Sequence, residues 1–342
     1  MTSNNYSAED TIAEFFTQTT VTRAECDSRA RELVGGNVVP VNFQGCCSYT
    51  VYGGAKQEFV VQFRLRPVLL KMKNITLARQ IYGSWAPGTT CHGHMGDMVD
   101  GKESVMVYVM DRVQGTSQLE FEISRDEPKN SLEYFAWRQN LISDLASFFA
   151  RAWNCPVHLD EEAREALHKR YEAELKLLRQ ALPDRFQPII QQSLDSLPAI
   201  MSLPTVLLHQ DLGVYNVMVD EKSHLVGIID WAEAEIGPFG VNLHFLQQTT
   251  GQKHLKHGWT RYDDYESLHH TFWASLKEGT GLGETEISKI KMAMVLGVLL
   301  SHGFTCRLAI MPPAVPIRED QNGAYNLLTL DGFLIDPKTK II

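Results

Sequence analysis

Three polar side chains interrupt the apolar segment Leu207 to Glu233, "LLHQDLGVYNVMVDEKSHLVGIIDWAE". Asp211 and Asn216 bracket a short loop, and Asp230 ends the strand that returns after the polar turn 220–224. Because the two strands of a hairpin lie side by side, we expect the three side chains to converge. Asn216 and Asp230 offer the hard oxygen ligands that suit Mg²⁺, which keeps water and phosphate in its other positions. Asp211 could then accept a proton from an attacking hydroxyl.

The order of these residues is more specific than their types. Asp and Asn are common at strand ends, where they bond their own backbone, so a single Asp would indicate only a turn. Here His209-x-Asp211 is followed by Asn216 five residues after the Asp, and then by an apolar hairpin that ends in Asp230. This ordered set is much more specific than a single turn residue and outweighs the turn interpretation.

The elements that must position these residues change type along the chain. Residues 38–65 hold two β-rich runs separated by "GGAK", a hairpin signal, and so predict an antiparallel sheet. A single helix is expected at Leu69 to Gly83, ending at the glycine. The apolar run 104–115 predicts a buried strand followed by a linker, which places a hinge near 111–115.

Helical patterns dominate after the hinge. Residues 131–153 predict a helix with a cap candidate at Asn130 or Ser131, and residues 160–182 predict another, capped by Asp160. The apolar stripe expected on the first helix comprises Leu132, Phe135, Leu141 and Leu145. The remaining patterns add further helices, so we expect a β-rich lobe followed by a larger helical lobe.

Length and composition agree with a two-lobed globular protein. The chain has 342 residues, of which 44% are hydrophobic and 21% charged, and its net charge is −9. An acidic balance of 41 Asp and Glu against 32 Lys and Arg gives no case for nucleic acid or an anionic membrane as a partner. The start lacks the regions of a secretory signal, and no apolar run is long enough to span a bilayer, so we expect a cytoplasmic protein.

The cysteines indicate neither a disulfide framework nor a metal site. Six cysteines in a reducing compartment are expected to be free, with Cys46 and Cys47 on opposite faces of a loop or strand. The segment "CHGHMGD", 91–97, has metal-ligating residue types, but no second ligand pair follows at zinc-site spacing. We therefore expect no metal in that segment.

The segment Leu207 to Glu233 resembles the catalytic core of the aminoglycoside phosphotransferase and choline kinase-like family, distant relatives of protein kinases. "HQDLGVYN" resembles the family's catalytic loop and "IIDWAEAEIGPFG" its metal-binding motif. Further segments, among them "QGCCSYTV", "FVVQFR", "LARQIYGSWAP" and "YNLLTLDGFLI", resemble a large group of fungal proteins of this superfamily, over nearly the whole chain. The resemblance implies an α+β, bilobal protein kinase-like fold, with a small antiparallel N-terminal lobe containing one helix (residues 1–111) and a mainly helical C-terminal lobe (112–342).

The resemblance also implies roles for individual residues. Asp211 would be the catalytic base, His209 a residue that orders its loop, and Asn216 and Asp230 the Mg²⁺ ligands. The segment 106–111 would be the hinge whose backbone, including Val109 and Asp111, pairs with the adenine of ATP. The acceptor, a small molecule, would lie near Trp231 and Glu233; together with Glu235 these acidic residues suggest a cationic or polyhydroxylated compound.

Other positions depart from the family pattern. Gln62 stands where the third strand normally carries a basic residue, and Thr76 where a helix glutamate would pair with it. Arg64 lies two residues further on and shares a strand face with Gln62, so either Arg64 supplies the missing charge or the charge is lost. Ser48 could contact phosphate from the first loop, which has only one glycine, and Asn242 replaces an aspartate that braces the catalytic loop in relatives.

Three functions remain open at this stage. The first is an ATP- and Mg²⁺-dependent phosphotransferase acting on a hydroxyl of a small molecule. The second is a pseudokinase that binds a nucleotide or another ligand, which the missing ion pair favours. The third is an enzyme of the same fold that uses His209 or Asp211 as an acid or base without transferring phosphate. The sequence does not fix the acceptor, the choice of ATP or GTP, or the oligomeric state.

Overall fold

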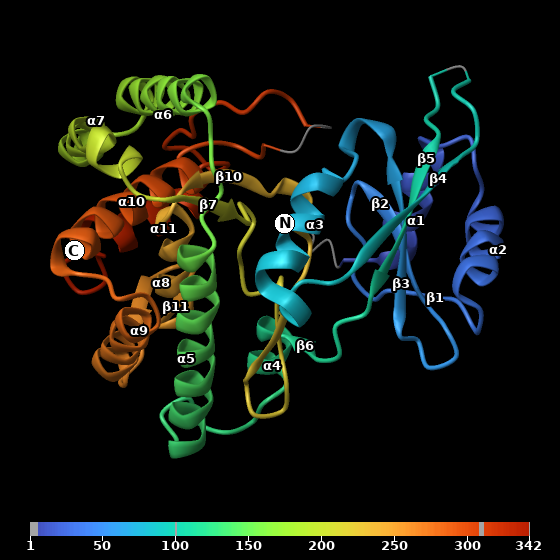
Figure 1. Cartoon of the computed structure of the whole chain (residues 1–342), viewed down its shortest axis with the longest axis horizontal. Helices are drawn as coiled ribbons and strands as arrows, with labels where there is room; N and C mark the ends of the chain where they lie inside the picture. Colours follow the sequence, from blue (N-terminus) through green and yellow to red (C-terminus); the bar gives the residue numbers. More distant parts are fainter. Residues whose placement is uncertain (1–5, 100, 308–310, 342) are drawn as a thin grey trace.

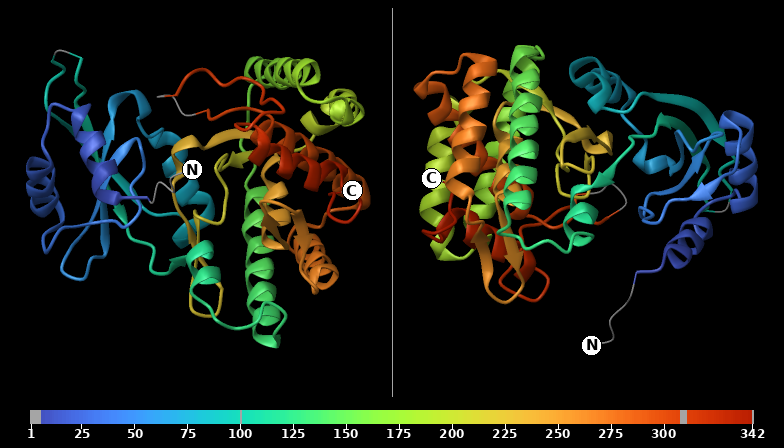
Figure 2. Two further views of the ribbon diagram at one scale, coloured as in Figure 1. Left: turned by 180° about the vertical axis from the view of Figure 1, so that it is seen from behind. Right: turned by 90° about the horizontal axis from the view of Figure 1, so that it is seen from below.

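The chain forms two lobes connected by residues 112–115 (Figure 1). The computed structural model describes residues 6–99, 101–307 and 311–341. The smaller lobe holds a β-sheet, the larger lobe is mainly helical, and helix α3 (Met72–Tyr82) lies between them in all three views (Figures 1 and 2).

A five-stranded antiparallel sheet forms the centre of the small lobe. Its strands are β1 (Val39–Pro40), β2 (Ser48–Gly53), β3 (Phe59–Leu65), β4 (Thr89–Met95) and β5 (Val105–Asp111), in the spatial order β1-β2-β3-β5-β4. β2 and β3 pair from Ser48 opposite Arg64 to Gly53 opposite Phe59, which confirms the predicted hairpin. The turn between them needs the positive φ of Gly54 (96°), a conformation that a side chain would strain.

Two helices that the sequence analysis missed cover one face of this sheet. They are α1 (Ala8–Thr17) and α2 (Arg23–Val34), so the prediction of a single helix in the small lobe was wrong. α2 buries only the small residues Cys26 and Ala30, and therefore carries no apolar stripe of the kind that marks a helix. Its start is nevertheless encoded, because Thr22 and Glu25 form a capping box.

The opposite face of the sheet is turned toward α3 and the large lobe. Gln62 and Arg64 of β3 lie on this face, opposite Tyr108 and Met106 of β5, and Ser48 lies beside Arg64 on β2. Because successive side chains alternate across a strand, these residues are separated from the α1–α2 side by the sheet itself. The face is thus the roof of the space between the lobes.

Helix α3 is attached to the large lobe. The Tyr82 ring stacks on Phe148 with centroids 4.1 Å apart, and the Arg151 guanidinium donates to the Tyr82 carbonyl at 3.0 Å. Near the other end of the helix, Asn74 Nδ2 donates to the Ala234 carbonyl at 2.6 Å. The helix ends at Gly83 (φ 60°), as predicted.

The large lobe is built from helices with short strands between them. Its helices are α4 (Gln118–Ile123), α5 (Leu132–Asn154), α6 (Glu161–Ala181), α7 (Gln187–Met201), α8 (Leu246–Thr249), α9 (Tyr265–Thr280), α10 (Glu284–His302) and α11 (Ala324–Leu330). Its strands are β6 (Thr116–Ser117), β7 (Thr205–Leu208), β8 (Val217–Val219), β9 (Leu225–Ile228), β10 (Glu235–Pro238), β11 (Gly251–His254) and β12 (Gly258–Arg261). Ser131 caps α5 and Asp160 caps α6, so both predicted helices are confirmed.

Two small antiparallel units carry the segment that the sequence analysis singled out. β8 and β9 form the predicted hairpin, with β6 added at the edge, and β7 pairs separately with β10. Together with the two lobes, this arrangement is a bilobal protein kinase-like fold of the α+β class. In the part of the chain that the structure describes, no helix has the length and apolar character needed to cross a membrane.

Candidate functional site

The loop between β7 and β8 brings Asp211 and Asn216 into direct contact. Asn216 Nδ2 donates to the Asp211 carbonyl at 2.8 Å and to Asp211 Oδ2 at 3.1 Å. The loop closes on itself through the Gly213 carbonyl, which accepts from the Asn216 amide at 2.9 Å. Since the side-chain Nδ2 of Asn216 already donates to Asp211, the side-chain Oδ1 is left for another partner.

Asp230 joins these residues from the end of β9. The Ile229 amide donates to the Asn216 carbonyl at 2.9 Å, which fixes the residue before Asp230 against the loop. Asp230 itself has left-handed backbone angles (φ 59°, ψ 63°), a conformation that a non-glycine residue rarely adopts. The predicted convergence of Asp211, Asn216 and Asp230 is therefore present.

His209 and Asn242 fix the backbone around this loop through buried hydrogen bonds. His209 Nε2 lies 2.8 Å from the Ile229 carbonyl and therefore carries the hydrogen, while the His209 amide donates to Asn242 Oδ1 at 2.7 Å. Burial lowers the pKa of His209, so its ring is neutral at physiological pH. These contacts agree with the loop-ordering role expected for His209, and Asn242 braces the same loop with a neutral side chain.

The Asp211 carboxyl is less acidic than an ordinary aspartate. Its pKa is raised to about 6, first because surrounding protein atoms displace water from the carboxyl and second because of the negative charge of Asp230. The bond from Asn216 opposes the shift, and a smaller repulsion comes from Glu233. The residue still reaches solvent, so a substrate hydroxyl has access to it. A carboxylate of this kind is a proton acceptor near neutral pH.

The donor set suits a magnesium ion. Asn216 Oδ1 and the solvent-exposed carboxylate of Asp230 are hard oxygen atoms of the kind that Mg²⁺ prefers, and the bond from the Ile229 amide to the Asn216 carbonyl holds their segments together. No cluster of three or more His, Cys, Asp and Glu side chains suited to a metal occurs within the described residues. A site with two protein ligands is what Mg²⁺ bound mainly through water and phosphate requires.

Comparison with known proteins identifies the family. The profile described as "Phosphotransferase enzyme family" matches residues 88–264, just over half of the chain. The chain belongs to this family. No curated protein matched the sequence. Whether the chain falls within the fungal group remains a prediction.

Solved structures of the same fold include kinases of small molecules. The macrolide 2'-phosphotransferase type I is 14% identical, with a TM-score of 0.52, over 82% of this chain and 91% of that one. The amicoumacin kinase hAmiN, solved with AMP-PNP, Ca²⁺ and Ami, is 13% identical, with a TM-score of 0.53, over 98% of this chain and 97% of that one. At these identities the likeness establishes the fold alone.

In this phosphotransferase the roof of the site carries a buried, unpaired cation. Arg64 is 5% exposed; its Nε donates to the Val68 carbonyl at 2.9 Å and its Nη1 to Gln62 Oε1 at 3.2 Å. None of the ion pairs found among the described residues involves Arg64. Gln62 in turn donates to Thr50 Oγ1 at 3.4 Å. Gln62, Arg64 and Ser48 are thus gathered on the face toward the cleft, as the sequence analysis expected.

The family's helix glutamate has no counterpart at Thr76. Thr76 of α3 is exposed to solvent and makes no side-chain hydrogen bond among the described residues. The contact between α3 and the Asp230 segment comes instead from Asn74, which bonds the Ala234 carbonyl. No sequence signal marks Asn74, because one asparagine on a helix is uninformative until its partner, 160 residues away, is known.

The adenine contacts expected from Val109 and Asp111 need correction. Both residues lie in β5, which pairs with β3 on one side and β4 on the other, so their backbone groups serve the sheet. The Asp111 side chain accepts from the Gly88 amide at 3.1 Å and lies 3.7 Å from the guanidinium of Arg79 on α3. The Arg112 amide still donates to the Glu58 carbonyl at 2.9 Å, so backbone outside the sheet begins only at residues 113–115.

Trp231 was also assigned wrongly, as an acceptor contact. It is 3% exposed, its Nε1 donates to the Ile228 carbonyl at 2.8 Å, and its ring packs edge-on against His209 with centroids 4.7 Å apart. Trp231 is therefore part of the core beneath the catalytic loop. Its neighbour Glu233 is partly exposed and close enough to Asp211 to affect its pKa, so it remains available to an acceptor.

Trp231→Ala should destabilise the protein rather than alter acceptor selectivity. Removing a large buried aromatic side chain costs about 3–5 kcal/mol of unfolding free energy, because the cavity is only partly refilled. Urea denaturation measures this loss, with Leu132→Ala, at an exposed position, as the control. If Trp231→Ala kept the stability of the wild type and raised the KM for the acceptor, Trp231 would contact the acceptor after all.

Glu235 is not a free acidic group. Arg170 binds both of its oxygens, at 2.7 and 2.9 Å, and Gln210 donates to it as well. The pair is half exposed, so it contributes little to stability. It nevertheless neutralises Glu235, which leaves Asp211, Asp230 and Glu233 as the acidic side chains at the loop.

Cys46 and Cys47 do not lie on opposite faces, contrary to the prediction. They occupy the turn before β2, and their sulfur atoms are 3.5 Å apart. In the segment 91–97, Cys91 and His92 are exposed on β4, and His92 contacts Thr90 Oγ1 at 2.9 Å. All six cysteines are free.

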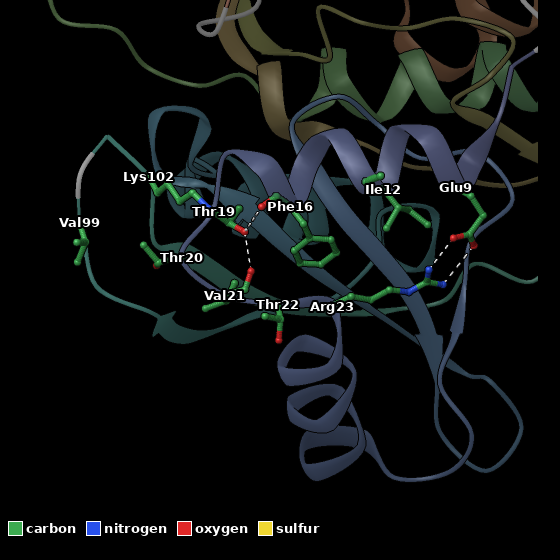
Figure 3. A pocket seen from close by; sticks show the side chains of 11 residues that line it. Glu9, Ile12, Phe16, Thr19, Thr20, Val21, Thr22, Arg23, Val99 and Lys102 are labelled. Atoms are coloured by element: carbon green, nitrogen blue, oxygen red, sulfur yellow. Dashed lines mark hydrogen bonds and ion pairs between the residues drawn. The ribbon is translucent and has the colours of Figure 1, made fainter.

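A cavity in the small lobe lies away from the loop that carries Asp211 (Figure 3). It has a volume of about 660 Å³ between α1, the α1–α2 turn and the tip of the β4–β5 hairpin, with Ile12, Phe16 and Val21 at its floor. The Arg23–Glu9 ion pair (2.7 Å) closes one end. The sheet separates this cavity from Arg64, so it takes no part in the site.

Proposed function

We propose that the protein transfers the γ-phosphoryl group of ATP, with Mg²⁺, to a hydroxyl of a small-molecule acceptor. The contact of Asp211 with Asn216, locked to the segment of Asp230, is the observation that carries the proposal. Membership of the phosphotransferase enzyme family supports the reaction class. The AMP-PNP bound by the amicoumacin kinase supports a nucleotide as the donor.

Asp211 is the proton acceptor of the reaction. Its carboxylate receives the hydrogen of the acceptor hydroxyl as the oxygen bonds to the γ-phosphorus, and the bond from that phosphorus to the bridging oxygen breaks. ADP leaves with the electron pair of the broken bond. Asn216 Nδ2 holds Asp211 Oδ2, which leaves the other oxygen of Asp211 to face the hydroxyl. Positioning of this kind accounts for most of phosphoryl-transfer catalysis.

Groups from both lobes would neutralise the negative charge of the nucleotide phosphates. A magnesium ion held by Asn216 Oδ1 and Asp230 would neutralise phosphate oxygens and fix their orientation. From the roof, Arg64 supplies the cation that relatives carry at the position of Gln62. A buried guanidinium without a carboxylate is costly, and bound phosphate would offset this cost. The backbone of residues 113–115 is our choice for the adenine contacts.

Activity should increase with pH around the pKa of Asp211. Because the unprotonated carboxylate is the active form and its pKa in the metal-free protein is about 6, kcat/KM is expected to rise with pH and to level off by about pH 7. Bound Mg²⁺ would offset the charge of Asp230, one of the two main causes of the raised pKa, so the rise should lie at lower pH when Mg²⁺ and nucleotide are saturating than when they are limiting. Steady-state profiles under the two conditions measure this, and a kcat/KM that does not fall at low pH in either profile would show that Asp211 is not the base.

The decisive experiment is a screen for ADP release with a panel of hydroxylated acceptors, followed by mass spectrometry of the products. A phosphorylated acceptor that requires both ATP and Mg²⁺ is the expected result. Turnover in nucleotide-free buffer would instead establish non-phosphoryl chemistry.

A ligand-binding pseudokinase is the second candidate. The neutral Gln62 and the exposed Thr76, in place of the usual ion pair, favour it. It predicts Mg²⁺-dependent binding of a non-hydrolysable ATP analogue in calorimetry, unchanged in Asp211→Asn, with no product from any acceptor.

A further inference from the structure

The turn that leads into β2 presents two thiols in contact. Cys46 and Cys47 are the central residues of this turn, in which the Ser48 amide approaches the Gly45 carbonyl at 3.5 Å. Their sulfur atoms are also 3.5 Å apart. Cys46 is exposed and Cys47 is buried, so a reagent from solvent meets Cys46 first and finds the second thiol beside it.

The turn is held in place by the sheet. The buried amide of Gln44 donates to the Thr50 carbonyl at 2.8 Å and accepts from the Thr50 amide at 2.9 Å. The Leu65 amide donates to the Cys47 carbonyl at 3.1 Å. Because these bonds fix the backbone on both sides of the thiols, little ordering is needed for a ligand to engage both sulfurs.

The thiols lie beside the end of β2 that faces the large lobe, because Ser48, which follows Cys47 directly, pairs with Arg64. Cys47 itself packs into the buried apolar cluster of the sheet. The pKa of Cys47 is raised, first by burial and second by the contact with Cys46. The charge of Arg64 lowers this pKa slightly, and the charge of Asp230 raises it slightly. Cys47 is therefore within electrostatic reach of both the roof cation and the residue from the end of β9. A group bound to the two sulfurs would adjoin the space assigned above to the nucleotide phosphates.

A direct disulfide does not suit this geometry. Neighbouring residues have Cα atoms about 3.8 Å apart, whereas a disulfide normally spans about 4.4–6.8 Å. A trivalent bridging atom with a lone pair bonds at about 90–100°, so bonds to sulfur of about 2.3 Å separate the sulfurs by about 3.3–3.5 Å. The observed 3.5 Å is close to this bridged distance.

The number of ligands excludes a structural zinc ion. A structural zinc ion needs four protein ligands, and within the described chain no third His, Cys, Asp or Glu joins the two thiols in a metal-binding group. A trivalent arsenic atom that carries one carbon substituent needs only two sulfurs. We propose that Cys46 and Cys47 form a dithiol site that captures monosubstituted trivalent arsenic compounds and thereby closes the nucleotide site.

The capture reaction needs no oxidant. An arsine oxide condenses with both thiols: two As–S bonds form, two S–H bonds break, and the arsenic-bound oxygen leaves as water. Arsenic stays trivalent throughout. The capture itself is independent of the function proposed above, whereas the closing of the nucleotide site rests on it.

Phenylarsine oxide is the probe, applied to the full-length protein in an excess of glutathione, which removes adducts held by one thiol. The wild type should gain one phenylarsenic group less two hydrogens in intact-mass spectra, and a dithiol such as dimercaptopropanol should remove it. Cys46→Ser should bind the probe about 10²-fold more weakly, because the second bond is no longer intramolecular. Cys155→Ser, which alters an exposed thiol of the other lobe, should behave as the wild type.

The effect on the nucleotide is measured separately. The affinity for AMP-PNP is determined first in the untreated protein and then in the adduct, where it should fall at least about tenfold, and AMP-PNP should slow capture. Equal capture by Cys46→Ser, or none by the wild type, overturns the site. An adduct that leaves AMP-PNP affinity unchanged overturns the closing of the cleft. Capture by a protein that binds no nucleotide even when untreated supports the thiol site and counts against the proposed function alone.

Discussion

Asp211→Asn should lower kcat by about 10²- to 10⁴-fold, the usual contribution of a positioned proton acceptor. The variant keeps an oxygen that can accept from Asn216 Nδ2, so the loop should retain its shape while losing its base. Nucleotide affinity should stay within about twofold of the wild type, because the altered group meets the acceptor hydroxyl rather than the nucleotide phosphates.

The measurement combines steady-state kinetics with calorimetric titration of AMP-PNP and Mg²⁺. Asp263→Asn is the matched control, since Asp263 is an exposed aspartate of the same lobe with no side-chain bond. A variant that keeps more than about a tenth of the wild-type kcat would exclude Asp211 as the base. Equal loss of nucleotide binding and turnover would instead mean that the loop had collapsed.

The position of this residue could be predicted because local sequence determines it. His209, Asp211 and Asn216 belong to one loop, and Asp230 follows the hairpin that begins at that loop, so chain geometry alone brings them together. Only short-range pairing was needed. The same holds for α5 and α6, whose ends are marked by the caps Ser131 and Asp160.

Where periodicity alone was used, errors followed. Leu132 was placed on the buried stripe of α5 but is 84% exposed, because the first residue of the helix precedes the turn that packs on the core. α1 and α2 were missed because each helix buries few residues, and those buried by α2 are small. Trp231 was taken for a ligand contact because sequence does not show which side of a loop faces solvent.

Contacts between distant segments also lay beyond the sequence. The bond from Asn74 to Ala234 and the pairing of Glu235 with Arg170 join residues 160 and 65 positions apart. β5 is an interior strand because β4 pairs with its second edge. This pairing surrounds Val109 with other strands, and so the predicted contact between its backbone and the nucleotide was wrong. Such facts belong to the packing of lobes and sheets rather than to any single motif.

The charge of the roof can be tested with Arg64→Met, which should weaken AMP-PNP binding about ten- to a hundredfold. A hydrogen bond between charged groups contributes about 1.5–3 kcal/mol, and each 1.4 kcal/mol changes affinity about tenfold. The unfolding free energy should change by less than about 1 kcal/mol. Removal of a buried unpaired charge is favourable, whereas the Val68 carbonyl loses its donor, and the two effects oppose each other.

A second variant distinguishes the two explanations of the neutral residue at position 62, namely that Arg64 supplies the missing charge or that the charge is lost. If Arg64 replaces it, adding Gln62→Lys to Arg64→Met should restore affinity, because the two side chains share the cleft face of β3 and an ammonium at position 62 faces the same phosphates. Arg66→Met, at an exposed position just beyond β3, should leave binding unchanged. Wild-type affinity in Arg64→Met, or a gain from Gln62→Lys in the wild-type background alone, would instead mean that Arg64 serves only the Val68 carbonyl and that the native cleft lacks its phosphate cation.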